Sequence, residues 1–228
     1  MLLGSANLER LRLAHVLVAG LGGVGAYAAE MLCRAGVGQL TIVDGDTVQQ
    51  SNRNRQLLAL CSNNGRLKTE VMAERLKDIN PDVNIITISK FLKDESLRDA
   101  ISDYDYVVDA IDTLSPKTFL MYCAVKSNLR IVSSMGAGGK IDPLQIRIDD
   151  ISKTYNCRLA SSVRNRLRKL GVTTGIKTVF STELINRDLV VPCKEQNKSS
   201  TVGTISYLPA MFGCICASVV IRDLCECN

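Results

Sequence analysis

Short apolar runs alternate with longer amphipathic segments through the first half of the chain. Runs of this length predict strands that are buried on both faces. They occupy residues 15–20, 39–46, 83–89, 104–112 and 130–134. Between these strands we predict four helices. The first ends at about residue 35, the second covers residues 65–80, the third lies around Asp94–Ile101 and the fourth covers residues 115–128. Repeated strand–helix units of this size predict a Rossmann-like, doubly wound α/β fold with a mostly parallel sheet.

The second half is less regular, and one uncharged stretch needs explanation. No residue from Ser199 to Ile221 carries a charge, which is enough length to span a bilayer. Pro209 interrupts it, so a strand near Val202–Tyr207 followed by a buried helix from about Pro209 to Leu224 is favoured over a membrane anchor. The segment EQNKSSTVG just before it (residues 195–203) predicts a flexible loop.

Composition indicates one folded, intracellular domain. The 228 residues, 46% of them hydrophobic, can form one sizeable core, and the net charge of +5 suits an anionic partner such as a nucleotide or RNA. The nine cysteines form no CxxC pair, which argues against a zinc site and favours reduced thiols. The chain opens without the charged-then-apolar pattern of a secretion leader, so we expect a cytoplasmic protein.

A glycine loop follows the first predicted strand. Gly20, Gly22 and Gly25 have GxGxxG spacing, with Gly23 beside them. Gly20 permits a tight turn, Gly22 and Gly23 let a phosphate approach the backbone, and Gly25 lets helix and strand pack closely. The following helix would present free N–H groups to an anion. A tight turn with no ligand is the weaker alternative.

Asp44 ends the next predicted strand, 44 − 25 = 19 residues after Gly25. An acid at this interval commonly accepts hydrogen bonds from ribose hydroxyls. The pairing predicts a nucleotide site and leaves open whether the nucleotide is a dinucleotide or ATP.

The stretch GDTVQQSNRNRQ that follows Asp44 favours ATP. Asn52 and Arg55 lie in an S-N-x-x-R-Q pattern, and Lys68 opens the next helix. Arginine and lysine suit the oxygens of a triphosphate, and Asp112 could hold the Mg²⁺ that bridges phosphates. Each of these charges alone could be a solvated surface group. Together with the glycine loop they predict ATP binding.

These motifs, in this order, resemble the ThiF/MoeB type of ubiquitin-activating-like adenylating enzymes. The resemblance implies one adenylating domain over 1–228, with a nucleotide-binding half (1–135) and a substrate and dimerisation half (136–228). It implies a homodimer that binds ATP, with Arg55, Lys68 and Asp112 catalytic and Asp112 on Mg²⁺. The implied ATP-binding residues are Gly20, Gly22, Gly23, Gly25, Asp44, Asn52, Arg55, Lys68 and Asp112.

The second half resembles one branch of that family more closely. The segments VVDAIDTLSPK, SSMGAGGKIDPLQI and VFSTE are similar to those of the tRNA threonylcarbamoyladenosine dehydratases. That branch cyclises a modified adenosine beside the tRNA anticodon through an acyl-adenylate. The alternatives are an enzyme that adenylates the C-terminus of a small sulfur-carrier protein, and, more remote, an NAD-dependent oxidoreductase or a silent Rossmann module. The resemblance leaves open a monovalent cation and a sulfur-relay partner.

A basic segment in the second half suits contact with the tRNA backbone. Arg164 and Arg168 share a helix face by i,i+4 spacing, with Lys169 beside them. A solvated surface helix explains the same residues equally well, and the resemblance favours tRNA.

Three other groups receive no catalytic assignment. His15, the only histidine, opens the first predicted strand, where a structural role is expected. Cys193 is the one cysteine that we expect to be exposed, and no neighbour indicates a lowered pKa of its thiol. Related enzymes use an N-terminal arginine on a dimer partner's ATP; here the first arginines are Arg10 and Arg12, and whether Arg10 serves is left open.

Overall fold

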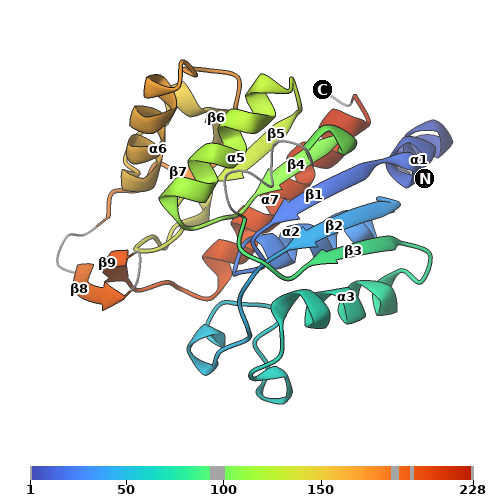
Figure 1. Cartoon of the computed structure of the whole chain (residues 1–228), viewed down its shortest axis with the longest axis horizontal. Coiled ribbons are helices and arrows are strands. Elements are labelled where there is room, and N and C mark those ends of the chain that lie inside the picture. Colours follow the sequence, from blue (N-terminus) through green and yellow to red (C-terminus); the bar gives the residue numbers. More distant parts are fainter. Residues whose placement is uncertain (1, 93–100, 186–189, 196–197, 227–228) are drawn as a thin grey trace.

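The computed structural model describes residues 2–92, 101–185, 190–195 and 198–226. Within them, seven strands form one sheet in the order β3-β2-β1-β4-β5-β7-β6, and two form a hairpin (Figure 1). The sheet strands are β1 (His15–Ala19), β2 (Gln39–Val43), β3 (Asn84–Ile88), β4 (Tyr106–Asp109), β5 (Ile131–Ser134), β6 (Ile146–Asp150) and β7 (Lys177–Ser181). The helices are α1 (Gly4–Leu13), α2 (Gly25–Arg34), α3 (Lys68–Ile79), α5 (Leu114–Lys126), α6 (Arg158–Lys169) and α7 (Tyr207–Leu224).

The predicted doubly wound fold is confirmed. All neighbouring strands pair in parallel except β6, which runs antiparallel to β7 at the sheet edge. The five strands expected from apolar runs are β1 to β5, each within the predicted residues. The helix predicted around Asp94–Ile101 falls, up to residue 100, outside the described residues.

Helices cover both faces of the sheet, because strands buried on both sides need apolar cover above and below. One core places α2, α3 and α7 against one set of strand side chains, including Val18 and Val108. The other places α5 and α6 against the alternate set, including Leu17 and Val107. Because alternate side chains of a central strand enter the two cores, the sequences of these strands are mostly apolar rather than alternating.

The order of the strands predicts a crevice beside β1. β2 and β3 extend the sheet on one side of β1, and β4 and β5 extend it on the other. The direction in which successive strands are added to the sheet therefore reverses at β1. In open parallel sheets, ligands bind beyond the carboxyl ends of the strands at this switch point. Ala19 and Asp109 pair at the ends of β1 and β4, so the loops that follow them flank the crevice.

Two predictions for the second half are wrong. The loop expected at 195–203 contains β9 (Lys198–Val202), which pairs antiparallel with β8 (Val190–Glu195). The strand expected at Val202–Tyr207 does not form, since β9 ends at Val202 and α7 begins at Tyr207. A proline at the third position of α7 is tolerated because the N–H groups of the first turn have no partner within the helix.

The predicted buried helix at the end of this region is confirmed, two residues longer at its start. α7 is long and apolar enough to cross a membrane, but half of it is buried inside the fold. A Cβ added to Gly213 would lie 2.4 Å from the carbonyl oxygen of Val24, so α7 packs closely against the start of α2. α7 is therefore a core helix of this domain.

Candidate nucleotide-binding site

The glycine loop joins β1 to α2 under tight steric constraint. Gly20 has a φ of +89°, and its amide donates to the Val43 carbonyl at 2.8 Å. A Cβ on Gly25 would lie 1.7 Å from the Gly20 oxygen. These contacts leave no room for a larger residue at Gly25, and they hold the first turn of α2 at the carboxyl end of β1.

The part of the loop around Gly23 is enclosed by two other segments of the chain. A Cβ on Gly23 would lie 2.9 Å from Cβ of Pro209 and 3.2 Å from the Arg55 carbonyl oxygen. Val24 occupies the N-cap of α2. Its apolar side chain cannot accept a hydrogen bond, so the backbone amides of the first turn are not capped by the N-cap residue. Such a helix start attracts an anion.

Asp44 lies directly after β2 and faces this loop. Its carboxylate accepts from the Leu21 amide at 2.6 Å and from the Asp46 amide at 2.8 Å. Burial raises the pKa of Asp44, while Lys68 and these two amides act in the opposite direction. The acid is thereby oriented at the mouth of the glycine loop, as a ribose acceptor would be.

Lys68 is almost fully buried beside the same acid. Its ammonium lies 2.9 Å from Asp46 Oδ2 and 3.8 Å from Asp44 Oδ2. Its backbone amide also donates to the Asp46 carbonyl at 3.1 Å, which fixes the start of α3. The structure thus brings Lys68 and Asp44 together, with the cation directed at carboxylates.

The S-N-x-x-R-Q stretch folds as a 3₁₀ turn against the glycine loop. Asn52 accepts from the Gln49 amide at 3.3 Å and closes the turn. Arg55 is half-buried, and its guanidinium donates to the Ser51 carbonyl at 3.2 Å and to Asn54 Oδ1 at 2.8 Å. Its stem would lie 3.6 Å from a Cβ on Gly23, so Arg55 lies directly beside the glycine loop.

Asp112 lies on the other side of the crevice, in the turn between β4 and α5. Its side chain is exposed. In the described residues no three His, Cys, Asp or Glu side chains are grouped to hold a metal, so a complete protein cage is absent there. One carboxylate on an open edge fits Mg²⁺, which typically keeps waters and phosphate oxygens as its other ligands.

A buried ion pair that sequence reasoning missed holds this turn. Lys117 Nζ lies 2.8 Å from Asp109 Oδ2, and both side chains are fully buried. Asp109 also accepts from Ser133 Oγ at 2.5 Å and from the Ile111 amide at 3.1 Å. Lys117 donates to the Ile111 carbonyl at 3.0 Å. The acid that ends β4 and the lysine of SPKT were signals for it, although lysine in a helix usually indicates a solvated surface.

A second buried lysine ties down the loop after β5. Lys140 Nζ donates to the carbonyls of Ser181 at 2.9 Å and Glu183 at 2.7 Å, with Asn156 at 3.4 Å. Burial lowers the pKa of Lys140. The lysine joins the glycine-rich loop Met135–Gly139 to the ends of β7 and the turn before α6, a role that the sequence did not reveal.

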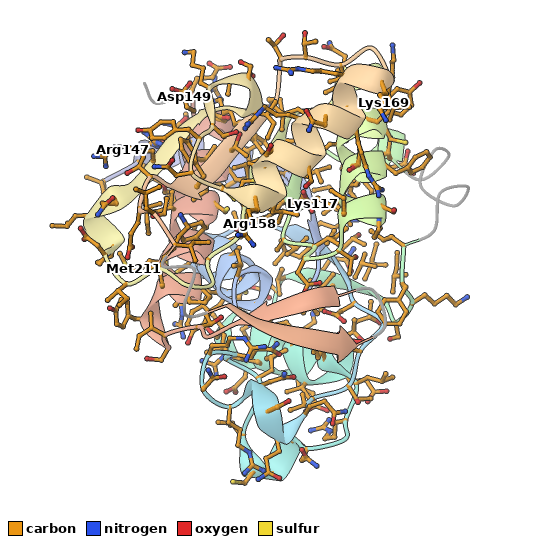
Figure 2. All side chains as sticks on the ribbon, turned by 90° about the vertical axis from the view of Figure 1, so that its left-hand side faces the viewer. Lys117, Arg147, Asp149, Arg158, Lys169 and Met211 are labelled. Carbon is orange, nitrogen blue, oxygen red and sulfur yellow. The ribbon has the colours of Figure 1, made fainter. Side chains whose placement is uncertain are left out.

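The residues predicted to contact tRNA all lie on α6 but differ in environment. Arg164 is half-buried, and its guanidinium donates to the Thr154 carbonyl at 2.8 Å. Arg168 and Lys169 are exposed. Figure 2 shows Lys169 at one end of α6 and Arg158 near the other.

The remaining sequence expectations have plain structural outcomes. His15 contacts Thr41 Oγ1 at 2.8 Å, and burial lowers the pKa of its imidazole, which fits a structural role.

Arg10 forms an ion pair with Glu226 at 3.1 Å. It lies on α1, which leads into the start of β1, whereas the glycine loop follows the end of that strand. The expectation that Cys193 is the one exposed thiol is wrong, because Cys61 is exposed; the side chain of Cys193 lies outside the described residues.

A glycine loop, an oriented acid and the nearby cations Arg55 and Lys68 at the switch point are typical of a nucleotide-binding α/β protein. The ThiF family model matches residues 1–228, and the chain belongs to that family. The family resemblance read from the motifs is confirmed.

Individual relatives are similar over nearly the whole chain. The tRNA threonylcarbamoyladenosine dehydratase of Bacillus subtilis is 38% identical, covering 97% of this chain and 91% of the relative. That of Haemophilus influenzae is 39% identical, covering 96% and 88%. The crystal structure of the Escherichia coli enzyme, TcdA, in complex with ATP is 36% identical with a TM-score of 0.91, covering 99% of this chain and 91% of that one.

Proposed function

We propose that this protein is an ATP-dependent tRNA threonylcarbamoyladenosine dehydratase that works through an acyl-adenylate. The observation that carries this proposal is the convergence of the glycine loop, Asp44 and Lys68 at one edge of the sheet, in a chain similar to these dehydratases over nearly its full length. Complexes of the E. coli relative with ATP and with AMP give further support.

The residues present fit ATP. The loop from Gly20 to Gly25 would receive phosphates on backbone amides, and Asp44 would accept from the ribose. Arg55 and Asn52 would lie along the triphosphate, with Lys68 nearby. For Lys68 and Arg55 to contact phosphate, their present bonds to Asp46 and to the Ser51 carbonyl must be exchanged for bonds to the ligand. Charge-assisted bonds to phosphate are strong enough to favour that exchange.

Mg²⁺, when bound, would neutralise charge that develops on the phosphate oxygens, with Asp112 as its protein ligand. The turn that carries Asp112 is held by the buried Asp109–Lys117 pair. The protein's contribution is to keep this carboxylate at a fixed place opposite the glycine loop.

The chemistry requires positioning and charge stabilisation rather than an enzyme nucleophile. The substrate carboxylate attacks the α-phosphorus and pyrophosphate leaves. The neighbouring carbamoyl group then attacks the activated carbonyl, closing the ring and releasing AMP. Well-oriented intramolecular attack reaches effective molarities of roughly 10⁵ M or more. His15, the only histidine of the chain, contacts Thr41 at the start of β1, the end of that strand opposite to the glycine loop.

We further infer a cytoplasmic homodimer with tRNA as its partner. Exposed apolar side chains at the start of α7, Tyr207 and Met211, support a second copy packing there, together with the exposed Ile141, whose carbonyl accepts from the Tyr207 hydroxyl at 2.8 Å. Met211 is labelled in Figure 2. A sulfur-relay partner and a monovalent cation stay open as additions to this proposal.

ATP–pyrophosphate exchange, measured with purified protein, tests the function. We expect exchange that depends on tRNA carrying threonylcarbamoyladenosine, together with formation of the cyclised nucleoside by mass spectrometry. Unmodified tRNA is the matched control. Exchange stimulated only by a small sulfur-carrier protein would support the alternative, and NAD binding without pyrophosphate release would support an oxidoreductase.

A further inference from the structure

A groove of about 310 Å³ lies between α5 and α6, apart from the glycine loop. The groove is open to the surface, so it suits a contact with a larger ligand rather than enclosure of a small one. Its lining residues are Ser115, Thr118, Phe119, Arg166, Lys169 and Leu170.

Both helices that form the groove are without acidic residues. α5 has the sequence LSPKTFLMYCAVK, and α6, RLASSVRNRLRK, carries five cations. Of these, Arg166 and Lys169 line the groove and are exposed. Cations in the last turn of a helix interact favourably with the helix dipole. This explains why some of the cations lie at the end of α6, but it does not explain why two of them line a groove.

The floor of the groove is apolar and continues as an aromatic strip. Phe119 is half-buried, and its ring lies 6.4 Å from that of Tyr122. Lys126 lies 5.7 Å from the centre of the Tyr122 ring. Aromatic rings beside cations are the chemistry with which proteins hold single-stranded RNA, since a base stacks on the ring and its phosphates meet the charges.

The groove is joined to the nucleotide edge through the start of α5. Arg166 donates to Ser115 Oγ at 2.6 Å, and Ser115 lies three residues after Asp112. Arg164, in contrast, is engaged with the Thr154 carbonyl. An arginine guanidinium has five N–H donors, so the bond to Ser115 leaves Arg166 donors for a phosphate.

We propose that the α5–α6 groove binds a splayed-out nucleotide of the tRNA anticodon loop, with its base on Phe119 and its phosphates on Arg166 and Lys169. The proposal rests on the proposed function and specifies how its RNA substrate is held. It replaces the Arg164–Arg168 helix face with Arg166 and Lys169 as the main contacts.

Binding of a labelled anticodon stem-loop RNA, measured by fluorescence anisotropy over a series of salt concentrations, tests the proposal. Loss of two phosphate contacts in R166Q/K169Q should lower the slope of log affinity against log salt by about 1.4 and weaken binding about tenfold near 0.15 M salt. The control R12Q/K77Q also removes two exposed cations, from helices α1 and α3, and should bind as wild type does.

A second variant tests the stacking floor. F119L keeps an apolar side chain but removes the ring face, and we expect RNA binding to weaken about fivefold or more. The melting temperature of F119L is measured alongside its RNA binding. If F119L melts at a markedly lower temperature, the RNA affinity of R166Q/K169Q alone decides the proposal.

R166Q/K169Q should bind ATP with the affinity of wild type.

The outcomes separate this proposal from the function. Equal RNA affinity and salt slope in R166Q/K169Q and in R12Q/K77Q would overturn the groove, whether or not wild type cyclises tRNA. The groove proposal would also be overturned if R166Q/K169Q bound RNA normally but lost ATP–pyrophosphate exchange stimulated by a sulfur-carrier protein. That result would indicate that the groove docks a protein. Failure of wild type to cyclise modified tRNA would overturn the function alone, since the binding slope decides the groove.

Discussion

Replacing Lys117 with methionine should destabilise this domain strongly. The substitution keeps an unbranched side chain, one atom shorter, but leaves Asp109 fully buried with its ammonium partner at 2.8 Å removed. Breaking a buried pair from one side typically costs about 3–5 kcal/mol, because the remaining charge is uncompensated. For a chain of this size each kcal/mol lowers the melting temperature by about 2–4 °C, so K117M should melt roughly 6–20 °C lower.

The double variant D109N/K117M separates the charge from the packing. Asparagine can still accept from the Ile111 amide, and no charge is then buried without a partner. We expect the double variant to lose about half as much stability as K117M or less, a strong departure from additivity. Denaturant unfolding of wild type, both single variants and the double variant gives the coupling free energy directly.

The control for K117M is K126M, at the exposed end of the same helix. It should change the free energy of unfolding by no more than about 0.5 kcal/mol. If K117M cost less than about 1 kcal/mol, or if the two single losses simply added in the double variant, the Asp109–Lys117 pair could not be what holds the turn that carries Asp112.

Three further predictions concern the crevice. Burial raises the pKa of Asp44 in the folded state, so the folded protein binds that proton more tightly than the unfolded chain does. The free energy of unfolding of wild type, relative to that of D44N, should therefore fall as pH rises above about 3.8, the ordinary pKa of the carboxyl group. Urea unfolding over a pH series measures this difference, and a difference that grew with pH would contradict a raised pKa of Asp44. R55A should slow ATP–pyrophosphate exchange about 100-fold or more with little change in melting temperature, as expected for a group that stabilises charge in the transition state; R53A is its neighbouring control. G25A should lose both nucleotide binding and stability, because a Cβ there would lie 1.7 Å from the Gly20 oxygen; wild-type affinity for ATP in a titration would refute this.

Most of the first half of the fold was predictable because β1, β2, β4 and β5 are buried on both faces, whereas the edge strand β3 was predicted from its apolar run although several of its side chains are exposed. β1, β2 and β4 lie in the middle of the sheet, so their sequences are continuous apolar runs with clear ends. β6 was not predicted, since it lies at the sheet edge and its sequence IRIDD exposes several side chains. β8 and β9 pair with each other outside the main sheet; the short apolar start of β8 (VVPCKE) is interrupted by a proline, and β9 (KSSTV) is polar, so neither predicted a strand.

The site was predictable where a residue's role follows from its spacing. The interval between Gly25 and Asp44 required only one βαβ unit, and the structure places both at the crevice. The partners of Lys68 could not be predicted, because Asp44 and Asp46 reach it through the packing of α3. The Asp109–Lys117 pair was missed for the same reason, as burial of a lysine is a tertiary property.

The contact between Pro209 and Gly23 sets the order in which the site can be assembled. The two residues lie far apart in the chain, yet the start of α7 closes one wall of the glycine loop. During translation the loop emerges long before the helix that supports it. A nascent chain with only its first strands completed would thus have the glycine loop without this wall, which is added only when synthesis has passed the start of α7.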